Sequence, residues 1–519
     1  MSLTRNFLSV GGLTLVSRIF GFVRDALMAA VLGISPVSDA FNAAFRFPNL
    51  FRRLFAEGAF NTAFVPMFSG ALETQGPDGA KELASRIMSW LVAVILVVTI
   101  LVEIFAPQIM VAFVPGFVGD AEKFDLTVFL TRIMFPYLAC MSLMAAYAAI
   151  LNSMGRFFAA AFAPIVLNIV NIGALIPLAI LTLEAPDTAF WVAIATMLGG
   201  IAQLALVWWA IRRAGMVPRI RLPRFDADVR RFWLLAVPAI IAGGITQINI
   251  FVGTIIASGA NEVMSIIYNA DRLYQLPLGI IGIAIGTVLL PDLSRHLSAG
   301  RDVEARQSQS YGLFLSMFLS MPAAGALIAM ALPVVRVLFE RGAFGAIDSV
   351  NVSQALIAFA AGLPAFVLIR VLQPGFFSRK DTKTPTWFAA ISLVINILLS
   401  LALFGPLKHV GIALATSIAA WVNVALLATF LARRGHFTIS AAEWKQQGLI
   451  LALTLVMSGA LWGTVLLLGP VFDPGYFFPA QALAMLALCV VGAGLYFALA
   501  HLTRLQPLGG LLRRLQRRR

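Results

Sequence analysis

Long apolar runs alternate with short polar segments along the chain of 519 residues. An apolar run of about 20 residues can cross the hydrocarbon core of a bilayer as a helix. The segments between the runs leave no room for a folded soluble domain. The pattern therefore predicts an all-α polytopic membrane protein. Its fourteen predicted transmembrane helices cover residues 10–32, 37–70, 87–110, 127–151, 159–182, 188–211, 233–257, 270–292, 309–331, 351–376, 386–405, 409–432, 447–468 and 480–502.

Composition narrows the class further. The chain is 60% hydrophobic and 12% charged, whereas soluble domains average about 45–50% and about 25%. This difference excludes a soluble enzyme, a disordered protein and a fibrous protein. The net charge of +14 would usually suggest nucleic acid, but the apolar bulk favours an anionic lipid surface or an anionic substrate carried in the membrane. Two cysteines, Cys140 and Cys489, cannot form a disulfide framework or a cysteine-rich metal site.

The basic residues predict an orientation, because Lys and Arg accumulate on the cytoplasmic side of membrane proteins. With the N-terminus inside, 26 of the 38 basic residues fall in inside segments. The alternation holds across all fourteen spans, which supports their number and places both termini in the cytoplasm. The first run contains Arg18 and Arg24 and lacks a convincing cleavage site, so we expect it to stay as a membrane helix. Only five basic residues fall outside: Lys123, Arg132, Arg336, Arg341 and Lys408.

The chain also contains a repeat, as transporters often do. Each copy holds six spans, an even number, so the copies share one orientation and an axis along the membrane normal. We predict two six-helix lobes at residues 1–225 and 226–440, followed by spans 13 and 14 and a basic cytoplasmic tail at 441–519. The alternative is a membrane scaffold that does not transport. The repeated positions are Thr62, Pro66 and Ser69 with Thr287, Pro291 and Ser294, and Pro136 and Asn168 with Pro364 and Asn396.

Charges inside the spans suggest the chemistry of a site. Each arginine at the bilayer centre costs at least about 2.5–3.5 kcal/mol when it faces lipid, so such residues usually face a cavity. The intramembrane acids are fewer, and we expect Asp25 to pair with Arg24 and Asp271 with Arg272. The excess positive charge favours an anion, and guanidinium forks suit phosphate. The seven arginines are Arg18, Arg24, Arg46, Arg52, Arg53, Arg272 and Arg370, and the acids are Asp25, Asp39, Glu57, Glu103 and Asp271.

A cavity role is the better interpretation for Arg18, Arg24, Arg52 and Arg272. The alternative is that an arginine reaches a membrane surface or ties helices together. That alternative is favoured for Arg53, which points about 100° away from Arg52 on a helix, and both interpretations stay open for Arg46 and Arg370.

Several motifs resemble one known family. The sequence is similar to the MurJ (MviN) family of lipid II flippases, within the MOP exporter superfamily, and the similarity runs along essentially the whole chain. The segments that carry it are Ser17-Arg18-Ile19-Phe20-Gly21-Phe22-Val23-Arg24-Asp25, Ser38-Asp39-Ala40-Phe41, residues 47–60, Asn269-Ala270-Asp271-Arg272-Leu273 and Pro374-Gly375-Phe376-Phe377-Ser378-Arg379.

The resemblance implies a substrate and a site. The substrate would be lipid II, the undecaprenyl-pyrophosphate-linked peptidoglycan precursor, moved from the cytoplasmic to the outer leaflet of the bacterial inner membrane for cell wall synthesis. Spans 13 and 14 would flank a groove for the lipid tail. No cofactor is expected. The residues implied to hold the pyrophosphate are Arg18, Arg24, Arg52 and Arg272, with Asp39 and Asn49 as polar partners.

The sequence departs from the family pattern in two places. Gln275 stands where some members carry an acid. Some members bind sodium, and Asn396 and Ser400, four apart and so on one helix face, resemble part of that site together with Thr416. Span 7, however, offers only neutral residues such as Gln247 and Asn249. Membrane potential, Na⁺ and H⁺ therefore stay open as the driving force.

The same residues also bear on other possible functions. A flippase for another polyprenyl-pyrophosphate-linked oligosaccharide shares nearly all of this chemistry, whereas a MOP-type drug or ion exporter would have a more acidic or aromatic cavity. A glycosyltransferase is disfavoured, because the four isolated histidines show no metal-ligand spacing. For the tail Arg513–Arg519, anionic lipid at the cytoplasmic face is favoured over nucleic acid. We expect a monomer.

Overall fold

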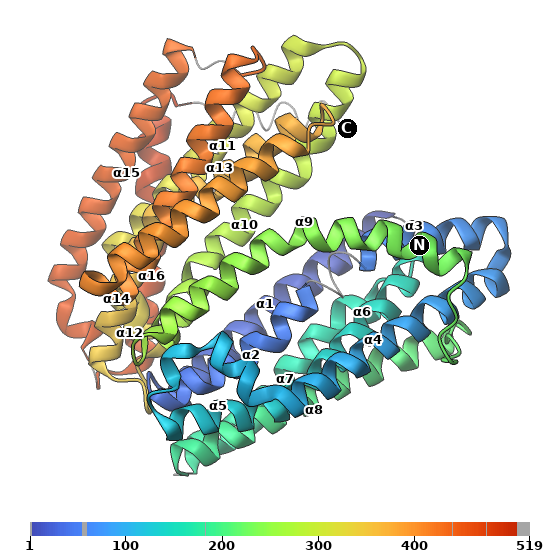
Figure 1. Cartoon of the computed structure of the whole chain (residues 1–519). Helices are drawn as coiled ribbons and strands as arrows, with labels where there is room; N and C mark the ends of the chain where they lie inside the picture. The colour runs from blue at the N-terminus through green and yellow to red at the C-terminus, as the bar shows by residue number, and fades with distance from the viewer. Residues whose placement is uncertain (1–2, 54–59, 182, 438–439, 474, 506–519) are drawn as a thin grey trace. The chain divides into compact units, whose positions relative to one another are not determined.

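The computed structural model describes residues 3–53, 60–181, 183–437, 440–473 and 475–505. Some helical side chains are not described, at residues 3–10, 241–243, 245–246, 283–284 and 286–288. The predicted intramembrane acid Glu57 and the tail Arg513–Arg519 lie outside the described residues. Almost everything that is described is helical, and no strand occurs in these ranges (Figure 1).

Two compact units divide the chain by their internal contacts. The first comprises Met1–Ser265 and Arg341–Phe344, and the second comprises Ile266–Glu340 and Gly345–Arg519. The lobe boundary predicted after residue 225 was placed by the sequence repeat, whereas the units defined by contacts divide after Ser265. The lobe boundary stays a prediction.

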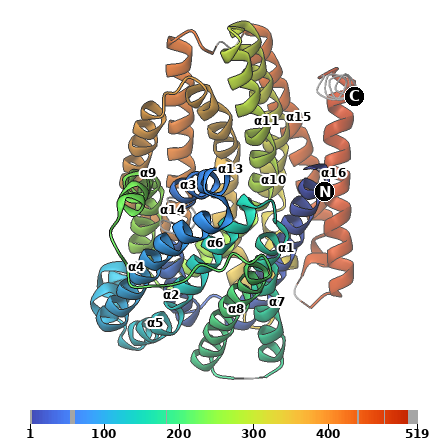
Figure 2. The same ribbon diagram turned by 90° about the vertical axis from the view of Figure 1, so that its right-hand side faces the viewer.

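The first unit holds nine α-helices and one 3₁₀ turn among its described residues. Helix α7 lies beside α8 and along α1, and α9 packs against α3 and α4 (Figures 1 and 2). The predicted span 127–151 is formed by α5 and α6, which meet at Pro136, a residue with no amide hydrogen to continue the helix. The elements are α1 (Leu3–Leu32), α2 (Pro36–Arg52), α3 (Phe60–Thr74), α4 (Gly76–Phe113), η2 (Pro115–Phe117), α5 (Ala121–Met134), α6 (Tyr137–Ser153), α7 (Phe158–Ile180), α8 (Ala185–Arg213) and α9 (Ala227–Ser258).

In the second unit, α13 packs along both α14 and α11 (Figure 2). Helix α14 contains the two predicted spans 386–405 and 409–432, and it breaks at Lys408, where φ is 44° and ψ is −120°. The short helix α12 lies outside every predicted span. The elements are α10 (Val263–Ser298), α11 (Asp302–Ala329), α12 (Ala331–Phe339), α13 (Ala346–Phe377), α14 (Lys383–Arg433), α15 (Ala441–Leu467), η3 (Gly469–Phe472) and α16 (Phe478–Leu502).

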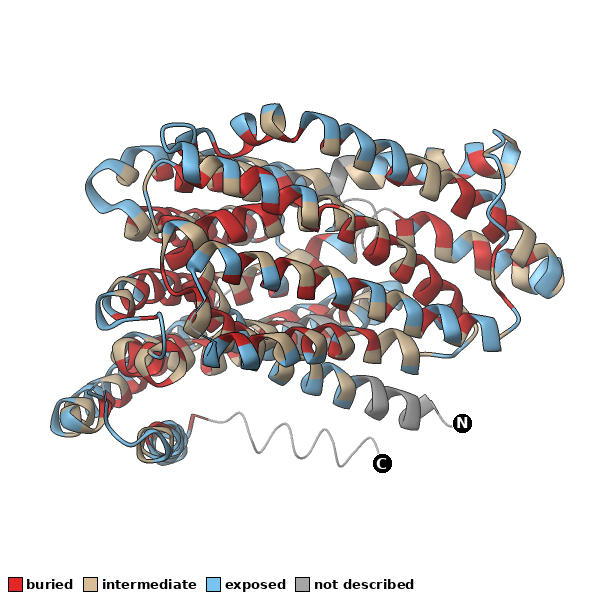
Figure 3. Ribbon diagram, turned by 90° about the horizontal axis from the view of Figure 1, so that it is seen from below, coloured by how far each residue is buried: buried red, intermediate tan, exposed pale blue. Residues whose placement is uncertain are grey.

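The helices have the length and surface of membrane spans. Among the described residues, nine helices are long and apolar enough to cross a bilayer, counting α14 as one. The helices α1, α2 and α10, which carry the candidate arginines, are not among the nine, and the number fourteen stays a prediction. Buried and exposed residues alternate along many of the helices (Figure 3), whereas α13 is buried over most of its length. On α4 the other face presents Leu96, Ile100 and Ile104, which are 57%, 48% and 60% exposed. Such large exposed aliphatic side chains suit contact with lipid.

Aromatic contacts fill the interior of each unit. In the first, Phe60, Phe64 and Phe68 stack along α3 with ring centroids 4.8 and 5.5 Å apart. In the second, the Tyr274 ring stacks on Phe359 at 4.9 Å. The helices satisfy their own backbone hydrogen bonds, as a bilayer core without water requires, so these side-chain contacts are left to fix how the helices pack.

A glycine allows one close approach in the first unit. The amide of Gly116 donates to the Ser258 hydroxyl at 3.1 Å. A Cβ on Gly116 would lie 2.1 Å from the Ser258 carbonyl oxygen, whereas a Cβ on Gly119 would meet nothing within 4 Å. This close approach holds η2 against the end of α9.

We expect Gly116→Ala to lower the free energy of unfolding by about 1–3 kcal/mol, because the added methyl must push backbone atoms apart. Thermal unfolding of the purified chain measures the change. Gly119→Ala is the matched control and should melt like the wild type; equal melting of both variants with the wild type would contradict the prediction.

Asp381 lies two residues before helix α14 in the second unit. It accepts from the Thr384 amide at 3.0 Å, from the Thr384 hydroxyl at 2.8 Å and from Arg434 at 2.7 Å. The Thr384 amide lowers the pKa of the Asp381 carboxyl, the Thr384 hydroxyl and Arg434 act in the same direction, and burial opposes them. The ionised form is therefore favoured in the folded state.

We expect this carboxylate to stabilise the fold at pH values above its unfolded pKa of about 3.9, and the gain to disappear as the pH falls through the lower folded value. The difference in melting temperature between wild type and Asp381→Asn should shrink between about pH 5 and about pH 2.5. The exposed Asp125 supplies the control Asp125→Asn. A difference independent of pH would contradict the assignment.

Candidate functional site

Arg24 lies on α1 and is paired with its neighbour. Its Nε and Nη2 both donate to Asp25 Oδ1, at 3.1 and 2.7 Å. The side chains are 12% and 5% exposed. The predicted pairing of Arg24 with Asp25 is therefore confirmed, and a carboxylate offsets the guanidinium charge inside the helical bundle.

Arg52 lies at the end of α2 and is held by Asn49. Arg52 Nε donates to Asn49 Oδ1 at 3.0 Å, and Asn49 Nδ2 donates to the Phe45 carbonyl at 2.8 Å. The three residues lie on one helix face because they are spaced three and four apart. The structure thus brings together two predicted site residues, Arg52 and Asn49.

Tyr137 lies beside the helix that carries Arg52. It begins α6, and its ring is buried, with a centroid 6.3 Å from that of Phe45, the residue whose carbonyl accepts from Asn49. An aromatic contact therefore joins α6 to the part of α2 that holds Asn49. Sequence reasoning missed Tyr137, because no local pattern marks it.

Asp39 belongs to a separate cluster, which we call the Asp39 cluster. This carboxylate, with 0% of its surface exposed, accepts from Lys123 Nζ at 2.9 Å, from the Glu262 amide at 2.7 Å, and from the Ser265 amide and hydroxyl at 2.9 and 2.6 Å. Lys123 Nζ also donates to Asn261 Oδ1 at 3.0 Å. The cluster joins α2, α5 and the connection between α9 and α10 within the first unit.

The sequence predicts that Lys123 lies in an outside connection. In the structure it lies at the start of α5, and its side chain is buried, with the residue only 3% exposed. The sequence could not identify it as the partner of Asp39, because the two lie 84 residues apart. Asp39 was predicted as a polar partner in the arginine site, and that role stays a prediction.

The remaining intramembrane arginines have varied surroundings. Arg18 on α1 is half-buried and Arg53 is exposed. Arg46 Nη1 donates to the Thr254 hydroxyl at 3.3 Å, so it ties α2 to α9. In the second unit, the exposed Arg370 lies with its Cδ 2.9 Å from where a Cβ on Gly282 would be.

Arg272 lies on α10 with an aromatic neighbour. Its Nη2 donates to the Tyr268 hydroxyl at 2.9 Å, and the guanidinium carbon lies 4.8 Å from the centre of the same ring. Asp271 accepts a hydrogen bond from Gln275, the residue that stands where some family members have an acid. Binding of an anion by Arg18, Arg24, Arg52 and Arg272 stays a prediction.

The predicted ion-site residues lie on the two parts of α14. Ser400 Oγ donates to Asn396 Oδ1 at 3.4 Å, which confirms that the two share a face. Thr416, beyond the break at Lys408, donates to the Ile412 carbonyl at 2.9 Å. These oxygen donors are neutral, and no group of three or more His, Cys, Asp or Glu able to hold a metal occurs among the described residues.

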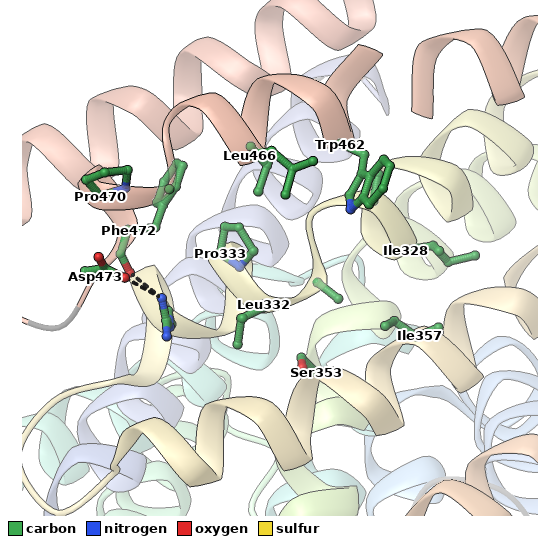
Figure 4. A pocket seen from close by; sticks show the side chains of 15 residues that line it. Ile328, Leu332, Pro333, Ser353, Ile357, Trp462, Leu466, Pro470, Phe472 and Asp473 are labelled. Atoms are coloured by element: carbon green, nitrogen blue, oxygen red, sulfur yellow. Dashed lines mark hydrogen bonds and ion pairs between the residues drawn. The ribbon is translucent and has the colours of Figure 1, made fainter. Parts of the chain in front are cut away.

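A pocket of about 560 Å³ opens in the second unit (Figure 4). Its wall is mostly apolar, with Ile328, Ile357 and Trp462 at one side. At the other end Arg336 Nη1 donates to the Phe472 carbonyl at 3.1 Å and to Asp473 Oδ1 at 3.2 Å. An apolar wall with an ion pair at one end suits an amphiphilic molecule.

These features together define an all-helical protein of the polytopic membrane class. Its fold is shared by the solved "Inward-facing conformation of a multidrug resistance MATE family transporter of the MOP superfamily", with a TM-score of 0.67 at 14% identity over 82% of this chain and 97% of that one.

Sequence comparison then gives the family. The family model described as "Lipid II flippase MurJ" matches residues 28–483. A "Probable lipid II flippase MurJ" from Rhizobium tropici is 45% identical over 100% of this chain and 98% of its own. A "Lipid II flippase MurJ" from Burkholderia cenocepacia is 36% identical over 96% and 97%. The solved "Lipid II flippase MurJ, inward closed conformation" is 26% identical, with a TM-score of 0.78 over 95% and 98%. The chain belongs to the MurJ family, as its motifs predicted.

The Asp39 cluster yields a stability prediction. Removing one partner of a buried ion pair leaves an uncompensated charge and costs about 3–5 kcal/mol. We expect Lys123→Met to lower the free energy of unfolding by about this amount, and the double variant with Asp39→Asn to recover part of it. Melting temperatures in detergent measure both effects. Lys445→Met, at an exposed lysine of α15, is the control, and an unchanged melting temperature for Lys123→Met would refute the prediction.

Proposed function

We propose that this protein flips lipid II from the cytoplasmic to the outer leaflet of the bacterial inner membrane, without covalent chemistry. The observation that carries the proposal is that Arg24 is paired with Asp25 in the interior of the first helical unit, while Arg52 is held by Asn49 at the end of α2. Two guanidinium forks can bind the two phosphates of a pyrophosphate with paired hydrogen bonds. Membership of the MurJ family supports this assignment, because relatives across its full length are named lipid II flippases.

The proposed binding step exchanges one anion for another. Before substrate enters, Asp25 offsets the charge of Arg24, so the guanidinium does not stand uncompensated in a medium of low dielectric constant. The pyrophosphate then competes with Asp25 for the same nitrogen atoms. Asn49 fixes Arg52 through Nε and so orients its fork. We assign Arg18, and Arg272 of the second unit, as further cationic contacts, and Asp39 and Asn49 as polar partners.

The topology that we propose has fourteen spans with both termini in the cytoplasm. Two six-helix lobes repeat about an axis along the membrane normal, and α15 and α16 are spans 13 and 14. The break of α14 at Lys408 supports two spans within that helix. Alternating access of the lobes about a central site would carry the head group across.

The lipid tail is proposed to stay in the bilayer beside α15 and α16. The apolar wall of the second-unit pocket, which includes Trp462 and Leu466 of α15, supports apolar contacts there. Ser400 bonds to Asn396, and Thr416 bonds to the backbone of its own helix. We propose membrane potential, Na⁺ or H⁺ as the driving force of the cycle, without a cofactor.

The proposal predicts the behaviour of Arg24→Ala in cells. We expect a bacterium that depends on this chain as its sole flippase to lose viability and to accumulate lipid II in the inner leaflet. The reason is that one phosphate of the substrate would lose its hydrogen bonds to the Arg24 guanidinium. Leaflet-specific labelling of lipid II, with membrane levels of the variant checked by immunoblot, measures this. Arg156→Ala, at an exposed arginine between α6 and α7, should flip normally.

Full flipping by Arg24→Ala would remove the basis of the pyrophosphate assignment. A competition assay separates the related alternative: lipid II should displace labelled lipid II better than other undecaprenyl-pyrophosphate glycans do. Equal displacement would indicate a flippase for polyprenyl-pyrophosphate oligosaccharides in general.

A further inference from the structure

A buried amide of α7 reaches out of its own helix to the arginine-bearing helix α1. Asn168 is 5% exposed, and its Nδ2 donates to the carbonyl of Ser17 at 3.1 Å. Ser17 directly precedes Arg18 and stands seven residues before Arg24. Most carbonyls of a helix accept a hydrogen bond from an amide of the same helix. The additional bond from Asn168 to the Ser17 carbonyl therefore ties this turn of α1 to α7.

The same turn contains a weak point of α1. Gly21 is the residue whose amide would pair with the Ser17 carbonyl in a regular helix, and glycine disfavours helix interiors relative to alanine. A Cβ on Gly21 would lie 3.5 Å from Asn168 Nδ2, an ordinary contact distance. Close packing therefore does not demand a glycine here. The turn between the two candidate arginines is intrinsically soft, and Asn168 bonds to it.

A second buried asparagine on α7 behaves differently. Asn171, one turn further along and 1% exposed, donates to the Leu167 carbonyl of its own helix at 3.0 Å and accepts from Thr196 of α8 at 3.0 Å. Asn171 therefore joins α7 to α8, and it makes no hydrogen bond to the described side chains and backbone of α1. The repeat partner of Asn168 in the second unit, Asn396, accepts from Ser400 on its own helix. The bond to α1 thus distinguishes Asn168 from its neighbour Asn171.

We propose that Asn168 is a positioning residue for the pyrophosphate site: its bond to Ser17 fixes the turn of α1 that aims Arg18 and Arg24. The ligand-binding part of this inference rests on the proposed function. Asn168 itself does not touch the substrate; it limits how far the soft turn at Gly21 can bend. Without the Asn168 side-chain amide, Arg18 and Arg24 remain on α1, but their guanidinium groups are less well oriented toward the substrate.

The first test needs no ligand, so that it stands apart from the proposed function. Cys140 and Cys489 are replaced by serine, and a spin label is attached through Ile19→Cys, at a side chain that is 55% exposed on α1. In lipid nanodiscs, Asn168→Ala should make the label more mobile, while Asn171→Ala should leave its spectrum unchanged. An unchanged spectrum in Asn168→Ala, or the same change in both variants, would overturn the positioning role.

The second test measures affinity for lipid II in the same nanodiscs. Asn168→Ala should weaken binding about fivefold to tenfold, the value of one net hydrogen bond, whereas Asn171→Ala should bind within about twofold of wild type even if it melts earlier. Adding Gly21→Ala to Asn168→Ala should restore most of the affinity, because alanine stiffens the same turn from within the helix. A role in packing alone would give no such rescue.

The outcomes of the two tests are separable. If the label responds as expected but the wild-type chain binds lipid II no better than an anionic phospholipid, the proposed function fails and the positioning of α1 by Asn168 survives. If wild type binds lipid II and Asn168→Ala binds equally well, the positioning role in binding is refuted and the proposed function is untouched.

Discussion

A charge inside the hydrocarbon core must find its partner within the protein, because no water is there to solvate it. The described part of this chain meets that constraint in several ways. Asp39 is enclosed by an ammonium, two amides and a hydroxyl. Arg24 is paired with the next residue along the chain, and Arg272 lies over a tyrosine ring.

The partners differ in how easily they can be exchanged. The four hydrogen bonds to Asp39 come from two chain segments, at Lys123 and at residues 262–265, and the carboxylate is fully buried, so it is held firmly in place. Arg24 is paired with the adjacent carboxylate of Asp25, and a substrate anion of higher charge can compete for the same nitrogens. The same electrostatic constraint therefore produces a rigid cluster at one place and an exchangeable pair at another. This difference is why we place the exchange of anions at Arg24 and treat Asp39 as a fixed polar partner.

The predictions that agree best with the structure concern residues a few positions apart in the chain. The pairing of Arg24 with Asp25 and the shared face of Asn396 and Ser400 follow from spacing along a helix, and both are confirmed. Asn49 lies three residues before Arg52, and the same spacing brings them together. The apolar runs likewise predicted helices that the structure contains, although two runs, 386–405 and 409–432, join into one helix with a break at Lys408. Only residues 406–408 separate the two runs, and so short a segment does not reveal whether the chain forms a loop or a break within one helix.

What the sequence by itself determined is the class, the family and the identity of the cationic residues, because these depend on composition, on runs of about 20 residues and on motifs contiguous in the chain. Only the tertiary structure decided which charges meet. Lys123 reaches Asp39 across 84 positions, and Asn168 reaches Ser17 across 151. The Tyr137 ring of α6 meets the Phe45 ring of α2. Such contacts depend on how helices pack against one another, and helix packing is set by many small side-chain contacts that no local pattern records.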